Sequence, residues 1–175
     1  SMRKRRSGQI INISSAAGLI GMPTMSAYCA SKFALEGATE SLWYEVHPWK
    51  IKVSLLIPRF INSDSFEKTR LTNQSLNSIL SEGKDPYYYH YKYMENLINW
   101  TMKRTMATPQ SIAKKVITLI KMNNPPLRKS ATIDALILNL FRRFLPRAIY
   151  HWVMFRFLPK SSRWGKDKFR ERFVA

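Results

Sequence analysis

A serine, a tyrosine and a lysine near the N-terminus have the types and spacing of an acid–base group that acts on an alcohol or a carbonyl. Ser15 follows an apolar run, Tyr28 comes thirteen residues later, and Lys32 follows the tyrosine by four. Residues four apart share one face of a helix, so the lysine ammonium is expected beside the phenol. A free phenol has a pKa of about 10, and a nearby cation stabilises its deprotonated form. Tyr28 is therefore the expected acid–base residue, and the Ser15 hydroxyl would hold the substrate oxygen.

Two buried strands and the helix between them are expected to position these residues. Residues 9–14 and 52–57 are mainly apolar runs, typical of parallel strands that are covered on both faces. Residues 26–47 are expected to form a helix, which Ser26 would cap. The order strand, helix, strand predicts an α/β fold with a right-handed parallel crossover. Ser15 then lies at the carboxyl edge of the sheet, where open α/β folds bind ligands.

The motifs around these residues resemble the short-chain dehydrogenase/reductase family. The likeness rests on G-Q-I-I-N-I-S-S-A-A-G at 8–18, Y-C-A-S-K at 28–32 and F-A-L-E-G at 33–37, and it fades beyond residue 125. Within the family, the chain resembles the C-terminal catalytic portion of hydroxysteroid and retinol dehydrogenases. The resemblance implies the C-terminal half of a Rossmann-like, doubly wound parallel sheet with a helical C-terminal extension. It also implies that the nucleotide-binding half, with its Gly-rich phosphate loop, would lie before residue 1.

The resemblance assigns roles to residues at both strand ends. Ser15, Tyr28 and Lys32 are the implied catalytic residues, and the cofactor is NADP or NAD, with NADP favoured. Arg59 stands where the family has a glycine; it is a substrate candidate together with Ser15, or else a solvated side chain. No metal site is predicted. The implied cofactor contacts are Ile13, Tyr28, Lys32, Pro58, Ile61 and Ser63.

Residues 1–126 are predicted to be the C-terminal part of a dehydrogenase domain, with a substrate lid over residues 64–106. Helices are expected at 66–80 and 87–100 within this lid. The aromatic residues of 87–100 favour a large lipophilic substrate such as a steroid, a retinoid or an acyl lipid. Their packing on the sheet is the alternative. The implied reaction is hydride transfer between the nicotinamide cofactor and a secondary alcohol or ketone, and this chain alone is expected to be inactive.

The remaining third of the chain is predicted to be mostly helical. A helix is expected to begin at Thr108-Pro109, because threonine can cap and proline suits the first turn. Its buried stripe would hold Ile112, Val116, Leu119 and Ile120. Residues 128–133 would form a short strand, and 127–175 a basic, amphipathic helical tail.

The net charge of +18 at pH 7 invites acidic partners. Residues 134–158 alternate apolar side chains with arginine, which is typical of helices that lie on anionic membranes. Docking on the substrate pocket or on another subunit is the alternative. Nucleic acid is not expected, because no helix carries a basic face with base-reading residues. The expected location is the cytoplasm, with peripheral membrane contact by residues 134–158.

The helix predicted over 26–47 has a face of small residues that allows close approach of another backbone. Packing on the sheet and packing on a second subunit both fit this face, and the family resemblance favours a homo-oligomer. The small residues are Ala27, Ala30, Ala34, Gly37, Ala38 and Ser41.

A second class of function stays open, namely a catalytically inactive fragment that binds a membrane or a partner protein. The charge and the absent nucleotide-binding half favour it. The intact set of Ser15, Tyr28 and Lys32 argues against it, because a binding protein has no need of that set. Cys29 is the single cysteine, so a disulfide within the chain is excluded.

Overall fold

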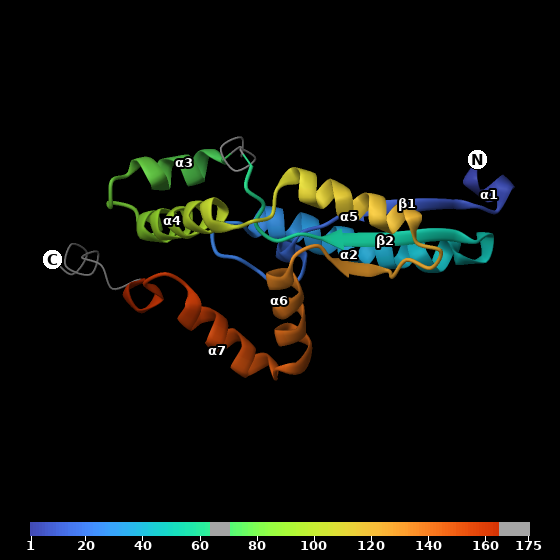
Figure 1. The fold of residues 1–175 in the computed structure, drawn as a ribbon. Coiled ribbons are helices and arrows are strands. Elements are labelled where there is room, and N and C mark those ends of the chain that lie inside the picture. The colour runs from blue at the N-terminus through green and yellow to red at the C-terminus, as the bar shows by residue number, and fades with distance from the viewer. Residues whose placement is uncertain (64–70, 165–175) are drawn as a thin grey trace. The chain divides into compact units, whose positions relative to one another are not determined.

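The computed structural model describes residues 1–63 and 71–164 and has an α/β fold (Figure 1). By contact density the chain divides into two compact units, residues 1–61 with 106–144 and residues 62–105 with 145–175. Each unit is described by itself. The helices and strands are α1 (Met2–Arg5), β1 (Gly8–Ile13), α2 (Ser26–Val46), β2 (Ile51–Ile57), α3 (Asn73–Leu80), α4 (Tyr88–Arg104), α5 (Pro109–Lys121), β3 (Arg128–Ser130), α6 (Ile133–Phe144) and α7 (Arg147–Phe157), with short 3-10 turns η1 (Ala16–Gly18), η2 (His47–Trp49) and η3 (Ser161–Arg163).

The first unit is built on a three-stranded parallel sheet in the order β1-β2-β3. Gly8 pairs with Ile51 at the start of the first two strands, and β2 pairs with β3 from Arg128 onward. Since all three strands are parallel, their carboxyl ends meet at one edge of the sheet. The loops that follow β1 and β2 are therefore neighbours.

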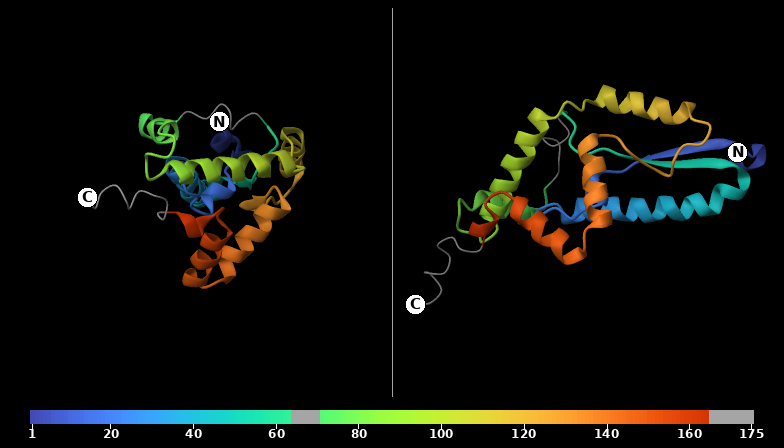
Figure 2. Two further views of the ribbon diagram at one scale, coloured as in Figure 1. Left: turned by 90° about the vertical axis from the view of Figure 1, so that its left-hand side faces the viewer. Right: turned by 60° about the horizontal axis from the view of Figure 1, so that its bottom comes forward.

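Helices α2 and α5 cover opposite faces of this sheet (Figures 1 and 2). Asn12 Nδ2 donates to Thr39 Oγ1 of α2 at 2.8 Å, while Gln9 Nε2 donates to the Leu119 carbonyl of α5 at 3.0 Å. Strand residues of opposite parity point to opposite faces, which explains the two directions. The predicted doubly wound, Rossmann-like sheet is confirmed.

The hydrophobic core of the first unit lies between the sheet and the helices on its two faces. Val53, Leu55, Leu56 and Ile57 of β2 are at most 1% exposed. Because β2 is the central strand and has a helix on each side, both faces of its second half are buried, including Ser54 and the apolar run Leu55–Ile57. Leu56 also joins a buried cluster between the sheet and α5, made up of Leu56, Ile112, Leu119 and Ala131.

Two details of the helices differ from the sequence-based expectation. Ser26 is not the cap of α2; Met25 holds that position, and no side chain caps the helix. In α5 the cap is as predicted, because Thr108 and Ser111 form a reciprocal capping box. The expected stripe of α5 was wrong at Ile120, which is 57% exposed.

The second unit is helical among its described residues. Ser75 of α3 and Tyr91 of α4 share a hydrogen bond between their hydroxyls at 2.9 Å. The rings of His90 and Trp164 lie 4.5 Å apart, so α4 also packs on the end of the described chain. Of the helix predicted over 66–80, the structure shows α3, and residues 64–70 lie outside the described part.

The predicted tail is shared between the two units, because α6 belongs to the first and α7 to the second. The predicted strand at 128–133 is shorter than expected, since β3 ends at Ser130 and α6 begins at Ile133. The domain limits at 126 and 127 stay a prediction, because compactness alone does not define a domain. Among the described residues, no helix is both long enough and apolar enough to span a bilayer.

Candidate active site

Ser15 begins the η1 turn directly after β1. Its backbone is extended (φ −159°, ψ 161°), and its Oγ accepts a hydrogen bond from the Ala17 N–H at 3.2 Å. This bond uses a lone pair of the hydroxyl oxygen, so the hydroxyl hydrogen stays available for donation. The turn thus presents a hydroxyl donor at the carboxyl edge of the sheet.

Backbone hydrogen bonds hold this serine turn against the end of β2. The Ser14 N–H donates to the Leu56 carbonyl at 2.9 Å, and the Ala16 N–H donates to the Pro58 carbonyl at 2.8 Å. Ser15 lies between these two anchored residues. Pro58, a predicted cofactor contact, is therefore at the same edge as the predicted catalytic serine.

Gly18 sets the distance between the serine turn and α2. A Cβ atom added to Gly18 would lie 2.9 Å from Ser14 Oγ and 3.0 Å from the Lys32 carbonyl oxygen. Such contacts are shorter than close-packed interiors accept, so a side chain here would push the turn and the helix apart. The sequence motif contained this glycine, but its role as a spacer came only from the structure.

Tyr28 and Lys32 lie next to each other on α2, as their spacing predicted. The Lys32 Nζ is 5.7 Å from the centre of the Tyr28 ring. The same ammonium donates to the Ile13 carbonyl, the last of β1, at 3.2 Å. Tyr28 is 43% exposed, so its ring is reachable from solvent. Lys32 thus connects the tyrosine to the strand end from which the serine turn departs.

A charged cluster that the sequence did not reveal ties α2 to β3. Arg128 Nε donates to Glu36 Oε2 at 3.1 Å, and Arg128 Nη2 donates to Glu40 Oε2 at 2.7 Å. The hydrogen bond from Arg128, together with its charge, lowers the pKa of Glu40. Burial opposes the charge on Arg128, but its hydrogen bonds to Glu40 and Glu36, together with the negative charges of these carboxylates, raise its pKa. The cluster fixes the helix that carries Tyr28 and Lys32.

The remaining predicted site residues do not all lie beside Ser15, Tyr28 and Lys32. Ile13 is at the strand end, and its carbonyl accepts from Lys32. Ile61 packs against the cluster between the sheet and α5. Arg59 forms an ion pair with Asp134 at 3.5 Å, so in this structure its guanidinium is engaged within the protein. Ser63 belongs to the second unit, and the structure does not place it relative to the serine turn.

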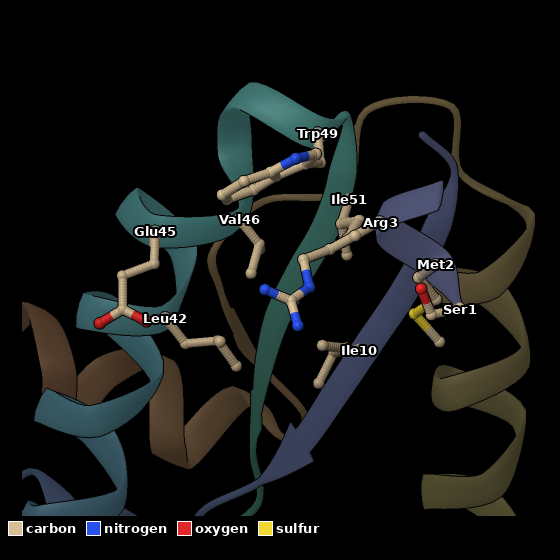
Figure 3. Close-up of a pocket in the computed structure, with 9 residues that line it drawn as sticks. All are labelled: Ser1, Met2, Arg3, Ile10, Leu42, Glu45, Val46, Trp49 and Ile51. Carbon is tan, nitrogen blue, oxygen red and sulfur yellow. The ribbon is translucent and has the colours of Figure 1, made fainter. Parts of the chain in front are cut away.

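The cavity drawn in Figure 3 lies at the amino end of the strands, opposite the serine turn, and measures about 570 Å³. A second cavity, of about 360 Å³, lies beside α6. Neither is lined by Ser15, Tyr28 or Lys32, which lie at an open edge of the first unit. The first cavity is lined by Ser1, Met2, Arg3, Ile10, Leu42, Glu45, Val46, Trp49 and Ile51.

The family model of the short chain dehydrogenases matches residues 1–74, the segment that holds the serine turn, α2 and β2. This segment, which is less than half of the chain, is similar to the short-chain dehydrogenase family, and we call it the dehydrogenase segment. The dehydrogenase segment thus includes every residue predicted for the site, and the resemblance found in the motifs is confirmed at family level.

Curated relatives extend the likeness further along the chain. A 3-ketodihydrosphingosine reductase of Bacteroides thetaiotaomicron is 35% identical over 128 residues, which are 73% of this chain and 45% of the relative. Human retinol dehydrogenase 8 is 33% identical over 135 residues, covering 75% of this chain and 42% of the relative. The chain thus spans less than half the length of these two relatives.

A solved structure shares the fold. It is a short-chain dehydrogenase/reductase from Burkholderia phymatum in complex with NAD, matched with a TM-score of 0.58 at 18% identity. The match covers 80% of this chain and 48% of the other. At this identity the comparison supports the Rossmann-like architecture alone.

Proposed function

We propose that this chain is the C-terminal catalytic portion of an NAD(P)-dependent oxidoreductase that moves hydride between the cofactor and a secondary alcohol or ketone. The observation that carries the proposal is the position of Lys32. Its ammonium lies over the Tyr28 ring and is bonded to the last carbonyl of β1, two residues before Ser15. The phenol and the ammonium are thus neighbours, and the ammonium reaches the strand end that precedes the Ser15 hydroxyl by two residues.

In the direction of ketone reduction, the Tyr28 hydroxyl donates its proton to the substrate oxygen. The Ser15 hydroxyl donates a hydrogen bond to the same oxygen and holds it in place. The Lys32 ammonium stabilises the negative charge left on the phenol oxygen. A bound nicotinamide cofactor supplies the hydride, and alcohol oxidation reverses each of these proton movements.

The residues at this edge fit a nicotinamide nucleotide. Lys32 offers an ammonium donor, and loops from two parallel strands meet here, as they do where α/β folds bind nucleotides. We propose NADP or NAD and favour NADP, because its additional phosphate suits a chain with a net charge of +18. The proposed contacts within the first unit are Ile13, Tyr28, Lys32, Pro58 and Ile61, and Ser63 stays a prediction from the sequence alone.

A lipophilic substrate is proposed on two grounds. The relatives are named for a sphingoid ketone and for retinol, which are both lipids with a long hydrocarbon part. In addition, α4 carries four tyrosines among its first six residues, and its Trp100 is 54% exposed. Ser15 is the proposed contact to the substrate oxygen. Arg59 would contact an acidic substrate group only if it left Asp134.

A homo-oligomer through α2 is proposed as well. The small residues Ala27, Ala30, Ala34 and Ala38 are exposed, so the sheet does not cover this face. A Cβ atom added to Gly37 would meet nothing within 4 Å. Such a face lets a second backbone approach closely. The proposed location is cytoplasmic, with peripheral membrane contact by the region 134–158.

The alternative proposal is an inactive fragment that binds a membrane or a partner. The net charge and the many exposed apolar residues of α6 favour it. One assay separates the two proposals: hydride transfer, followed by nicotinamide absorbance, for the longest natural protein that contains this chain. Turnover of a long-chain ketone supports the oxidoreductase, and no turnover with either cofactor supports the fragment. The 175-residue chain by itself is expected to be inactive in both cases.

A further inference from the structure

Helix α6 exposes one continuous apolar face in the first unit. Its large side chains recur at the helical spacing of three and four residues, so they form a single stripe. Two of them, Ile133 and Phe144, are more than 70% exposed. The stripe consists of Ile133, Leu136, Ile137, Leu140, Phe141 and Phe144, each at least 43% exposed; we call it the α6 face.

The first unit itself fixes the direction of this face. On the other side of α6, Ala135 and Leu138 are buried. Asp134, in the first turn, is held by Arg59 at 3.5 Å, and Asp134 Oδ1 accepts from the Ala135 N–H. The helix therefore cannot turn its apolar stripe inward without exposing Ala135 and Leu138.

A basic groove borders the α6 face. The cavity of about 360 Å³ is lined by Asn139, Arg142 and Arg143 of α6 together with residues of the serine turn, α2 and β3. Arg143 lies one helical turn after Leu140, so the groove opens beside the apolar stripe. The guanidinium of Arg142 is held 5.0 Å from the centre of the Phe33 ring.

These two arginines have no acidic partner among the described residues. The ion pairs there are Arg59–Asp134, Arg128–Glu36 and Arg128–Glu40. Asp134 is the sole acidic residue of α6, and it is already paired. Glu36 also lines the groove, but its carboxylate is paired with Arg128. Within the part of the chain that the structure describes, the groove therefore combines two unpaired arginines with an adjoining apolar surface.

We propose that α6 docks on an anionic phospholipid surface, with the apolar face in the acyl region and a headgroup phosphate in the groove at Arg142 and Arg143. This inference refines the membrane contact proposed above and is independent of hydride transfer. Long apolar side chains beside arginine are the composition of interfacial helices. A second copy of the chain is a poorer occupant of this face, because a symmetric contact would bring the Arg142 and Arg143 of both copies together.

The test is sedimentation of the 175-residue chain with lipid vesicles. Binding is expected to vesicles that contain phosphatidylserine and to be weak to vesicles of phosphatidylcholine alone. Replacing both arginines (R142Q/R143Q) should weaken binding by about 25-fold, since each basic residue near an anionic surface contributes about fivefold. The double variant K114Q/K115Q removes the same charge from α5 and is expected to weaken binding far less.

The apolar half of the contact is tested by I137Q/L140Q, which should lower vesicle binding at least tenfold. I117Q/I120Q is the matched control, because these α5 side chains are similarly exposed (50% and 57%). Circular dichroism melting should give the same Tm for all variants and the parent.

Three results would overturn the inference. Equal losses in the α5 and α6 variants would show that binding follows total charge alone. A marked drop of Tm in I137Q/L140Q would show that another part of the chain covers the α6 face. Self-association that I137Q/L140Q abolishes, without any binding to vesicles, would assign the face to a second copy.

Discussion

Helices α2 and α6 both belong to the first unit, and each exposes a long face of different character. The exposed face of α2 is lined by alanine and glycine, whereas that of α6 carries six large apolar side chains. A small-residue face allows a rigid partner backbone to approach closely. A face of long, flexible side chains beside arginines suits a fluid, charged surface.

The difference teaches that exposed apolar area alone does not identify a partner. On α2, the exposed alanines stand on the helix that carries Tyr28 and Lys32, so a protein contact there would also brace the site. On α6, the exposed residues are remote in sequence from the dehydrogenase segment of 1–74. The residue size and the neighbouring charge distinguish the two surfaces.

The largest expected effect concerns the chemistry carried by α2. In the longest natural protein that contains this chain, Tyr28→Phe should lower kcat by about 100-fold to 10,000-fold, because the proton donor is lost. Cofactor affinity, measured by nicotinamide fluorescence, should stay nearly unchanged. Tyr44→Phe is the control: Tyr44 lies on the same helix and is 62% exposed. Retained activity in Tyr28→Phe would contradict the mechanism.

Substitutions on the two faces are expected to affect the oligomeric state differently. Ala34→Arg places a long charged side chain on the small face of α2 and should dissociate the oligomer. Ile137→Gln on α6 should leave the oligomer intact. Light scattering after gel filtration measures both. If Ala34→Arg has no effect while Ile137→Gln produces monomers, the assignment of the two faces is reversed.

A smaller effect is expected where the serine turn approaches α2. Gly18→Ala should lower the free energy of unfolding by about 1–3 kcal/mol, because its Cβ would overpack against Ser14 and the Lys32 carbonyl. Gly37→Ala is the matched control on α2: nothing lies within 4 Å of its Cβ, and alanine favours the helix by about 1 kcal/mol. Urea unfolding measures both, and equal effects would show that Gly18 is not a spacer.

The smallest expected effect is the pH dependence at the anchor of α2. Arg128 lowers the pKa of Glu40, so this carboxylate stabilises the fold above its ordinary pKa of 4.5. That stability is lost as the pH falls through the lowered value in the folded protein. Glu40→Gln should therefore flatten the acidic limb of a plot of Tm against pH. The same change in an Arg128→Gln background should have no such effect; a similar flattening there would exclude the ion pair as its cause.

Much of the candidate site could be predicted from the sequence, because its signals are local. The spacing of Tyr28 and Lys32 on a helix, the apolar strands and the Thr108 cap each depend on residues within one or two turns. The order of these elements also predicted the parallel crossover. The prediction that Ser26 caps α2 was wrong, because the helix begins at Ser26 itself, one residue earlier than a serine cap would require.

What only the tertiary structure decided depends on residues that are distant in the chain. The bond of Arg128 to Glu36 joins positions 92 residues apart, and no local pattern pairs them. The close approach at Gly18 depends on where α2 crosses the turn. Likewise, the sequence indicated a small-residue face on α2 and an amphipathic helix in the tail, but packing within the first unit determined which side each helix buries. Local sequence fixes periodicity and chemistry, whereas burial is a property of the whole packed unit.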